Sequence, residues 1–334
     1  MFSITLLLFF PFYAIFSKPD FVIIEPNFPI LSFIPVLPLF RSKKIKLFLD
    51  IRSTPVETFG IRGFLRSFYF NMSVLVAKKL FNGITIITPL MKEEVCRKFS
   101  LNPNSVGVWS SGVNKSLFNS EYYAFEAQDL KKKLELSQKF IVFYHGAFSA
   151  NRGLTQIIEA IYAIKNTVPD VVLFLLGTGS IIEDLKKLII VKGLQKNIVI
   201  HNSVKYTEVP KYIAIADICI VPLPNNKYWR FQCPLNLLEY LAMGKMTIAT
   251  DIPANRLVIG EQKCVIYLSS VEPIEIAEAI EYAYRNKEKL KEWGSTGRKL
   301  IEENYTWEKV AKDLQNYLIS VDKKVPFTAK FRNE

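Results

Sequence analysis

Residues 233–251 of this chain are CPLNLLEYLAMGKMTIATD, a stretch whose pattern predicts a helix, a glycine stop and a buried strand. Pro234 suits the first helical position, where its missing N–H costs nothing. Gly244 suits the position just past the helix end, and residues 246–250 follow as a short, mostly apolar strand. The predicted helix carries an apolar stripe formed by Leu235, Leu238, Leu241 and Ala242. A strand–helix arrangement of this kind indicates an α/β protein.

The start of this predicted helix has the properties of an anion site. The backbone N–H groups of Leu235, Asn236 and Leu237 should have no partner inside the helix, and they lie at the positive end of its dipole. Glu239, about one turn further in, is polar on a helix that is otherwise largely apolar. A carboxylate would repel a phosphate beside it, so we expect Glu239 to face two vicinal hydroxyls, such as those of a ribose.

The same stretch resembles the nucleotide-sugar signature of retaining GT-B glycosyltransferases of family 4, in the branch written Pro-x-Lys-x-x-Glu-Tyr-x-Ala-x-Gly. Asn236 stands where that branch usually has Lys. The family's other form has two Glu separated by seven residues; Glu239 matches the second, and Phe231 occupies the place of the first. The matching residues are Pro234, Glu239, Tyr240, Ala242 and Gly244. The alternative interpretation of the stretch is a core helix of any α/β domain.

Length and composition allow two globular domains. The chain has 334 residues, half of them hydrophobic, with no excess of Gly or Pro. The net charge of +12 fits a nucleic acid, an anionic lipid or a diphosphate ligand, although solvated helix faces explain most lysine clusters. The cysteines have neither metal-site nor disulfide spacing, which favours a reduced, cytoplasmic location; they are Cys96, Cys219, Cys233 and Cys264.

The first sixteen residues, MFSITLLLFFPFYAIF, are almost wholly apolar. No basic region precedes the apolar run, no small-x-small cleavage site follows it, and Pro11 interrupts it. It is shorter than the ~20 residues that a spanning helix needs. We expect a buried or membrane-facing helix and peripheral binding at the inner face of the membrane, with a signal peptide as the alternative.

Alternating strands and helices predict two doubly wound, Rossmann-like domains with parallel sheets. We expect an acceptor-side domain over residues 1–118, a linker over 119–138 and a nucleotide-sugar domain over 139–305. A last helix and tail, 306–334, would cross back toward the first domain. Four strands are predicted before the linker and six after it. The resemblance implies that about two opening βα units of the family's first domain are missing, which indicates either a wrongly assigned start or a naturally short protein.

The predicted strand Phe140–Tyr144 is followed by HGAFSANRGL, which is similar to the family's Gly-Arg-x-x-x-x-Lys-Gly turn. Gly146 and Gly153 match, Arg152 stands for the Lys, and Ala147 replaces the Arg. A glycine lets the backbone approach a phosphate, and Arg152 would bind phosphate oxygens bidentately. An ordinary strand-to-helix loop is the alternative, and His145 is expected to be a structural imidazole.

Two further positions in the second domain match places near the family's donor site. Gly177 begins a Gly-Thr-Gly turn that lacks the third glycine and the acidic residue of a dinucleotide fingerprint, so no nicotinamide cofactor is expected. Val204 follows a predicted strand in a turn that, in the family, lies against the nucleotide base. The resemblance therefore implies donor contacts at Gly177 and Val204.

The first domain should carry acceptor-side groups, because ligands bind at the carboxyl ends of strands in such folds. Asp50 and Arg52 follow one predicted strand and Glu25 another. By alignment, Asp50 takes the place of a family His that interacts with donor sugar and acceptor, although Asp50 and Arg52 could simply pair. Gly112 lies in a segment similar to the Asn-Gly-Val-Asp-x-x-x-Phe that closes the family's first domain.

The resemblance implies a retaining transfer of a hexose from a nucleotide-diphosphate sugar to a glycan or lipid-linked acceptor. Asp50, Arg152 and Glu239 are its candidate catalytic residues. The sequence contains no Asp-x-Asp pair, so we expect no metal and no cofactor. One alternative is a catalytically inactive sugar-nucleotide-binding relative. The other is a basic nucleic-acid-binding protein, which the aromatic residues disfavour because they lie mainly in apolar runs.

Overall fold

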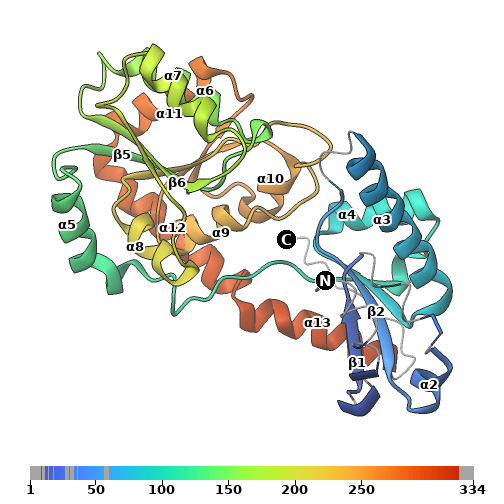
Figure 1. Cartoon of the computed structure of the whole chain (residues 1–334). Coiled ribbons are helices and arrows are strands. Elements are labelled where there is room, and N and C mark those ends of the chain that lie inside the picture. Colours follow the sequence, from blue (N-terminus) through green and yellow to red (C-terminus); the bar gives the residue numbers. More distant parts are fainter. Residues whose placement is uncertain are drawn as a thin grey trace. The chain divides into compact units, whose positions relative to one another are not determined.

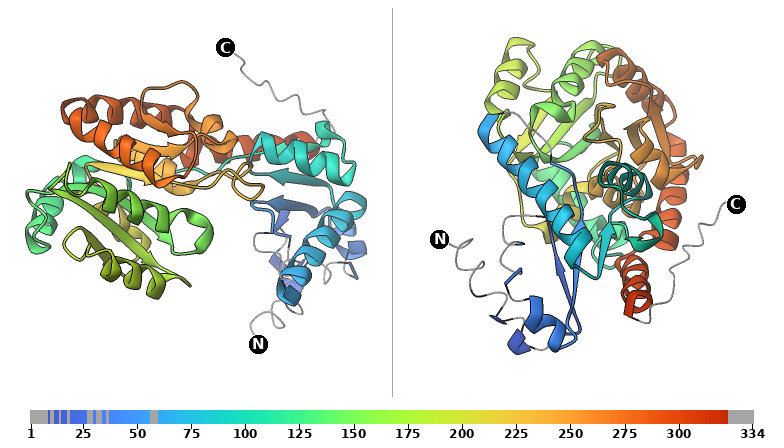
Figure 2. Two further views of the ribbon diagram at one scale, coloured as in Figure 1. Left: turned by 90° about the horizontal axis from the view of Figure 1, so that it is seen from above. Right: turned by 90° about the vertical axis from the view of Figure 1, so that its right-hand side faces the viewer.

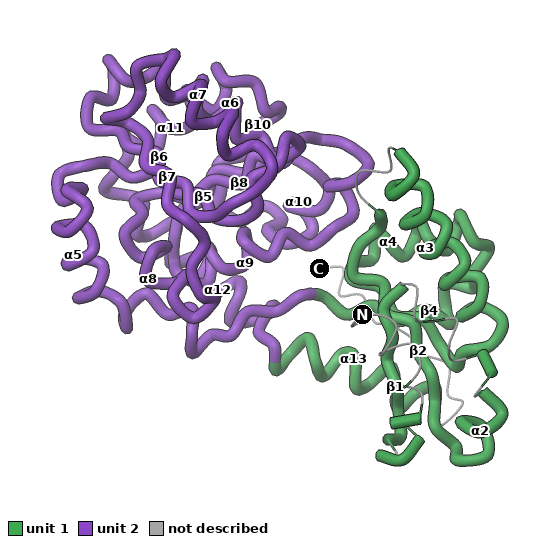
Figure 3. The backbone as a smooth tube through the Cα atoms, viewed as in Figure 1, with its two compact units in different colours: residues 1–110, 308–334 green, residues 111–307 purple. Residues whose placement is uncertain are grey.

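The computed structural model describes residues 9, 12–13, 15–17, 19–26, 30, 34–35, 37–55 and 60–322. The helix expected over Met1–Phe16 therefore lies largely outside the described residues. The chain forms two compact units (Figure 3): one comprises Met1–Ser110 and Glu308–Glu334, and the other comprises Ser111–Trp307. Each unit is described by itself below.

The first unit is built on a parallel sheet with strand order β1-β2-β3-β4 (Figure 1). Its strands are short and mostly buried, as expected for strands covered on both faces. Their bounds are β1 Phe21–Ile24, β2 Lys46–Ile51, β3 Gly83–Ile86 and β4 Val106–Val108. Its helices are α2 Leu37–Ser42, α3 Gly60–Leu80 and α4 Pro89–Phe99, together with α13 from the end of the chain. Within the described residues, no helix combines the length and apolar composition that crossing a bilayer requires.

Helix α13, Trp307–Asp322, packs against the sheet of the first unit through Tyr317, which is 1% exposed. The Tyr317 hydroxyl donates to the carbonyl of Ser105 (2.7 Å) and accepts from the N–H of Ile84 (3.2 Å). A Cβ atom at Gly107 would lie 2.5 Å from the Tyr317 ring, so only glycine leaves room for the ring there. This packing fixes α13 on the sheet of the first unit.

The second unit holds a six-stranded parallel sheet in the order β10-β9-β8-β5-β6-β7. Helices cover both faces of this sheet (Figure 2), as in a doubly wound fold. Alternate residues of β5 enter opposite apolar clusters: Ile141 and Phe143 face one, and Val142 and Tyr144 face the other. The strand bounds are β5 Phe140–Ala147, β6 Val171–Thr178, β7 Ile198–His201, β8 Ile218–Val221, β9 Thr247–Thr250 and β10 Val265–Leu268.

The helices of the second unit follow the predicted alternation. Their bounds are α5 Ala124–Lys133, α6 Leu154–Ile164, α7 Ile182–Val191, α8 Val209–Ala214, α9 Leu235–Ala242, α10 Pro253–Ile259, α11 Pro273–Arg285 and α12 Leu290–Asn304. Helix α5 and the segment after it are part of this unit rather than a free connection, because Ala127, Leu130 and Leu136 are buried in its apolar core. The chain order reverses between β5 and β8, which creates a topological switch point at their carboxyl ends.

Candidate donor-binding site

A cavity of about 400 Å³ lies in the second unit at the residues that follow β5 and β8. Its wall includes His145 and Leu223, from the ends of these two strands, and the start of α9. Six predicted donor-site residues line it, namely Gly146, Arg152, Pro234, Leu235, Asn236 and Glu239. Gly153, Gly177 and Val204 are not among its lining residues. The switch point of this sheet is where a doubly wound fold binds its ligand.

The start of α9 differs from the prediction in three details. Pro234 is the extended residue before the helix (φ −74°, ψ 103°) and not its first helical residue. The Leu237 N–H is not free, because the Pro234 carbonyl (3.1 Å) and the Asn236 side chain (3.1 Å) both accept from it. Leu235 is 39% exposed and lies at the cavity rather than in the core. The N–H groups left for an anion are those of Leu235 and Asn236.

Glu239 is held by a short chain of hydrogen bonds. Its side chain is 2% exposed, and its Oε2 lies 2.8 Å from Nε2 of His145. The other ring nitrogen of His145, Nδ1, lies 3.0 Å from the Tyr240 hydroxyl, which also accepts from the His145 backbone N–H at 2.8 Å. A carboxylate only accepts hydrogen bonds, so Nε2 donates to Glu239, and Nδ1 can then accept from the Tyr240 hydroxyl. Burial raises the pKa of Tyr240 well above its usual value, so this hydroxyl stays protonated.

The second oxygen of the Glu239 carboxylate is available to a ligand. Glu239 Oε1 is buried and makes no well-formed hydrogen bond within the described part of the chain. The Tyr206 hydroxyl is close to this carboxylate: burial raises the pKa of Tyr206, and the charge of Glu239 and a hydrogen bond to its carboxylate raise that pKa further. A buried carboxylate oxygen that lacks a well-formed hydrogen bond is costly. A hydroxyl donor entering the cavity, such as a ribose, would satisfy it.

Arg152 lies on the wall of the same cavity and is oriented by Trp229. Its guanidinium stacks on the Trp229 ring, 4.8 Å from the ring centroid. The indole N–H of Trp229 donates to the Asn151 carbonyl (2.9 Å), which fixes the ring against the loop that carries Arg152. Gly153 then turns the chain into α6 with φ +70°, where a Cβ atom would lie 2.3 Å from the Pro222 carbonyl oxygen. The loop is therefore held at the end of β8.

Sequence reasoning missed two of these residues. His145 is hydrogen-bonded through both ring nitrogens, as expected of a structural imidazole, but nothing in the sequence indicated that it lines the cavity and holds Glu239. Trp229 lies in no recognisable motif. Its position shortly before the signature at 233–251 was the signal that could have pointed to a role at the site. Two of the three donor-site candidates outside the cavity wall, Gly177 and Val204, have packing contacts instead. Gly177 lies against Gly146 of the neighbouring strand, and Val204 packs against the apolar core after β7.

The acceptor-side candidates lie in the first unit, except Gly112, which is buried in the second. Asp50 is 5% exposed and accepts hydrogen bonds from Thr85 (2.7 Å) and from the Trp109 indole (2.9 Å). Nε of Arg52 lies 3.9 Å from Oδ2 of Asp50, which makes only a weak ion pair. The Arg52 guanidinium instead stacks on the Trp109 ring and donates to the Trp109 carbonyl (2.9 Å). Burial raises the pKa of Asp50, although these contacts oppose the shift. Glu25 is exposed after β1.

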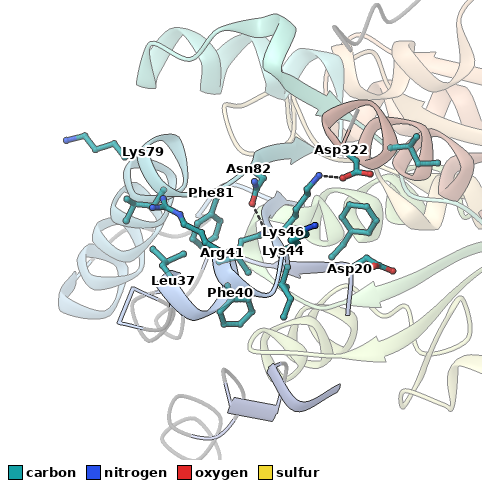
Figure 4. A pocket seen from close by; sticks show the side chains of 15 residues that line it. Asp20, Leu37, Phe40, Arg41, Lys44, Lys46, Lys79, Phe81, Asn82 and Asp322 are labelled. Atoms are coloured by element: carbon teal, nitrogen blue, oxygen red, sulfur yellow. Dashed lines mark hydrogen bonds and ion pairs between the residues drawn. The ribbon is translucent and has the colours of Figure 1, made fainter. Parts of the chain in front are cut away.

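A larger cavity of about 820 Å³ lies in the first unit, at the residues before β1, β2 and β3 (Figure 4). Arg41 and Lys79 line it from the last turns of α2 and α3, and Lys46 pairs there with Asp322. Cations are stabilising at helix carboxyl ends, which explains their position without a ligand. No group of three or more metal-binding side chains occurs in the ranges that the structure describes.

The sequence profile of the glycosyl transferases group 1 family matches residues 126–300, more than half of the chain. The chain belongs to this family. It is 23% identical to an alpha-D-kanosaminyltransferase of Streptomyces kanamyceticus over 199 residues, which are 60% of this chain and 50% of that protein. It is 21% identical to a GDP-mannose-dependent alpha-(1-6)-phosphatidylinositol monomannoside mannosyltransferase of Mycobacterium tuberculosis over 192 residues, 57% of this chain and 50% of that one.

The fold of this member of the glycosyl transferases group 1 family resembles solved GT-B structures. HepE of Anabaena, solved in complex with UDP, superimposes with a TM-score of 0.75 at 12% identity, over 93% of this chain and 82% of that one. The predicted GT-B-like fold class is therefore confirmed, as is the family resemblance. The chain spans about half the length of the curated relatives that it matches.

Proposed function

We propose that this chain is a retaining hexosyltransferase that uses a nucleotide-diphosphate sugar, with the cavity in the second unit as its donor site. The observation that carries the proposal is the buried Glu239 carboxylate, which has one oxygen held by His145 and the other turned to no well-formed partner. Such an oxygen suits a ribose hydroxyl. Family membership and relatives named as sugar transferases support the same donor class.

In this proposal, residues on the cavity wall would supply the groups that the transfer needs. Glu239 would hold the ribose, while Arg152 and the backbone N–H groups at the start of α9 would bind the diphosphate. These donors stabilise negative charge on the departing phosphate, which is the largest contribution to such reactions. The leaving phosphate would help to deprotonate the acceptor on the same face of the sugar, which retains the anomeric configuration. Asp50 is the acceptor-side candidate, and a glycan or lipid-linked acceptor with peripheral membrane contact completes the proposal.

The direct test is a transfer assay with UDP- and GDP-sugars and a panel of glycan and lipid-linked acceptors, with the anomer of the product assigned by NMR. Retained configuration is expected, and an inverted product would contradict the mechanism. The second candidate function is an inactive sugar-nucleotide-binding protein. It is favoured by Phe231 and Ala147, which replace a Glu and an Arg of the family pattern. Tight donor binding with neither transfer nor donor hydrolysis would identify it.

Arg152→Ala should weaken binding of a nucleoside diphosphate about tenfold or more while leaving the bare nucleoside nearly unaffected. The reason is that charge-assisted bonds to phosphate contribute about 1.5–3 kcal/mol each, and the ribose does not use them. Calorimetric titration with nucleosides and nucleoside diphosphates measures both affinities. Arg285→Ala, which removes an exposed arginine on α11 of the same unit, is the matched control. Equal losses for both ligands would remove Arg152 from the diphosphate site.

Chelation of metals should leave the transfer rate unchanged. Helix N–H groups and Arg152 would supply the positive charge that metal-dependent transferases take from a divalent cation. The measurement is turnover before and after treatment with EDTA, with Mg²⁺ and Mn²⁺ added back. Loss of activity on chelation with recovery on adding Mn²⁺ would contradict the proposed mechanism.

A further inference from the structure

Helix α3 is apolar on the side that faces away from the sheet of the first unit. Its buried residues, which include Phe70, Val74 and Ala77, follow one face of the helix. On the opposite face, large apolar side chains remain exposed: Ile61 (81%), Phe64 (67%), Leu65 (42%), Phe68 (47%) and Leu75 (43%). We call these five residues the α3 outer face. A surface helix usually has polar residues there, and a helix that is apolar all round is normally covered on both sides.

The side chains of the α3 outer face form one patch and not scattered positions. Ile61, Phe64, Leu65 and Phe68 occupy positions i, i+3, i+4 and i+7, which bring them together on one side of the helix, and Leu75 extends the row by two turns. Contiguous exposed apolar surface of this kind marks an interaction site. The question is therefore which partner covers it.

The charge of the helix decides among the partners. Helix α3 carries four basic residues, Arg62, Arg66, Lys78 and Lys79, and no acidic residue. A symmetric contact with a second copy of this chain would set these cations against the same cations of its twin. An anionic phospholipid surface, in contrast, offers phosphates to the cations and an apolar interior to the phenylalanines.

We propose that the α3 outer face docks the first unit onto an anionic phospholipid bilayer. The helix would lie in the plane of the interface, with Phe64 and Phe68 entering the acyl boundary and Arg62, three residues before Leu65 at the edge of the outer face, at the level of the phosphates. The proposal gives a surface to the peripheral membrane contact put forward under the proposed function. It rests on that contact alone and requires neither donor binding nor transfer.

The test is sedimentation of the whole protein with vesicles of phosphatidylcholine alone or mixed with phosphatidylglycerol. We expect the wild-type protein to bind the anionic vesicles, and Phe64→Gln combined with Phe68→Gln to weaken binding at least tenfold. The matched control is Tyr122→Gln combined with Phe125→Gln, which removes two exposed aromatic residues (65% and 74%) from the second unit and should change nothing. The proposal is overturned if the wild-type protein does not bind anionic vesicles. It is also overturned if the Phe64/Phe68 variant binds them as tightly as wild type.

A second variant separates the charge from the apolar contact and does not depend on the first. Arg62→Gln should weaken binding to anionic vesicles and flatten its salt dependence. Size-exclusion chromatography is the parallel measurement: a wild-type dimer that the Phe64/Phe68 substitutions dissociate, with vesicle binding unchanged, would overturn the proposal in favour of a second copy. The calorimetric affinity for nucleoside diphosphate should be equal in all variants. If the protein binds no nucleoside diphosphate, the vesicle-binding result still tests the docking proposal.

Discussion

Replacing Glu239 by Gln should lower the affinity for the nucleoside roughly ten- to 150-fold. The substitution keeps the shape of the side chain but removes a charge that would accept ribose hydroxyls in a buried site. Charge-assisted hydrogen bonds of this kind contribute about 1.5–3 kcal/mol, which corresponds to that range at 1.4 kcal/mol per decade. The fold should change little, because the Gln carbonyl oxygen can still accept from Nε2 of His145, which now lies 2.8 Å from the carboxylate.

Two measurements together separate a ligand-binding role of Glu239 from a structural one. Calorimetric titration with nucleoside and nucleoside diphosphate should show similar losses for both ligands, unlike Arg152→Ala. Thermal unfolding should show nearly the same melting temperature as wild type. Glu183→Gln is the matched control, since Glu183 is 70% exposed on α7 of the same unit. A Glu239→Gln protein that binds donor as tightly as wild type, but melts earlier, would show that Glu239 only supports the fold.

Gly177→Ala should destabilise the second unit by about 3 kcal/mol, within the range for overpacking and strained backbone. Gly177 has φ +153°, and a Cβ atom there would lie 2.0 Å from the carbonyl oxygen of Gly146 on the neighbouring strand. That atom belongs to the backbone of β5, which is paired with β6 along its length and cannot move alone. The free energy of unfolding, measured by urea titration, gives the loss directly.

Gly193→Ala is the matched control for this substitution. Gly193 also has a positive φ (+62°), but nothing lies within 4 Å of the Cβ atom that alanine would add. Its replacement should therefore cost only the strain of a left-handed alanine, about 1 kcal/mol. Equal losses at Gly177 and Gly193 would mean that the approach of β5 to β6 is not the cause, and that backbone strain alone accounts for both.

The α/β fold and the position of the donor site could be predicted because their signals are local. The strand predicted over Phe140–Tyr144 forms the first part of β5, and the one predicted over residues 246–250 contains β9, since short apolar runs bounded by turn residues favour buried strands in an α/β chain. The glycine after α9 is likewise read from neighbouring residues: Gly244 has the predicted left-handed conformation, φ +64°. The prediction for the start of the same helix was less accurate, because the conformation of helix-end residues depends on what packs against them.

Amino-acid order alone thus determined the parallel α/β architecture, the family and the helix that carries Glu239. Only the tertiary structure decided what holds that carboxylate, because His145 lies 94 positions away in the sequence and meets it at the cavity where β5 ends and α9 begins. Only the tertiary structure likewise shows that Trp229 stacks on Arg152, that Tyr317 packs over Gly107, and that one side of α3 is left exposed. Periodicity identifies an apolar residue, but only packing decides whether another part of the chain covers it.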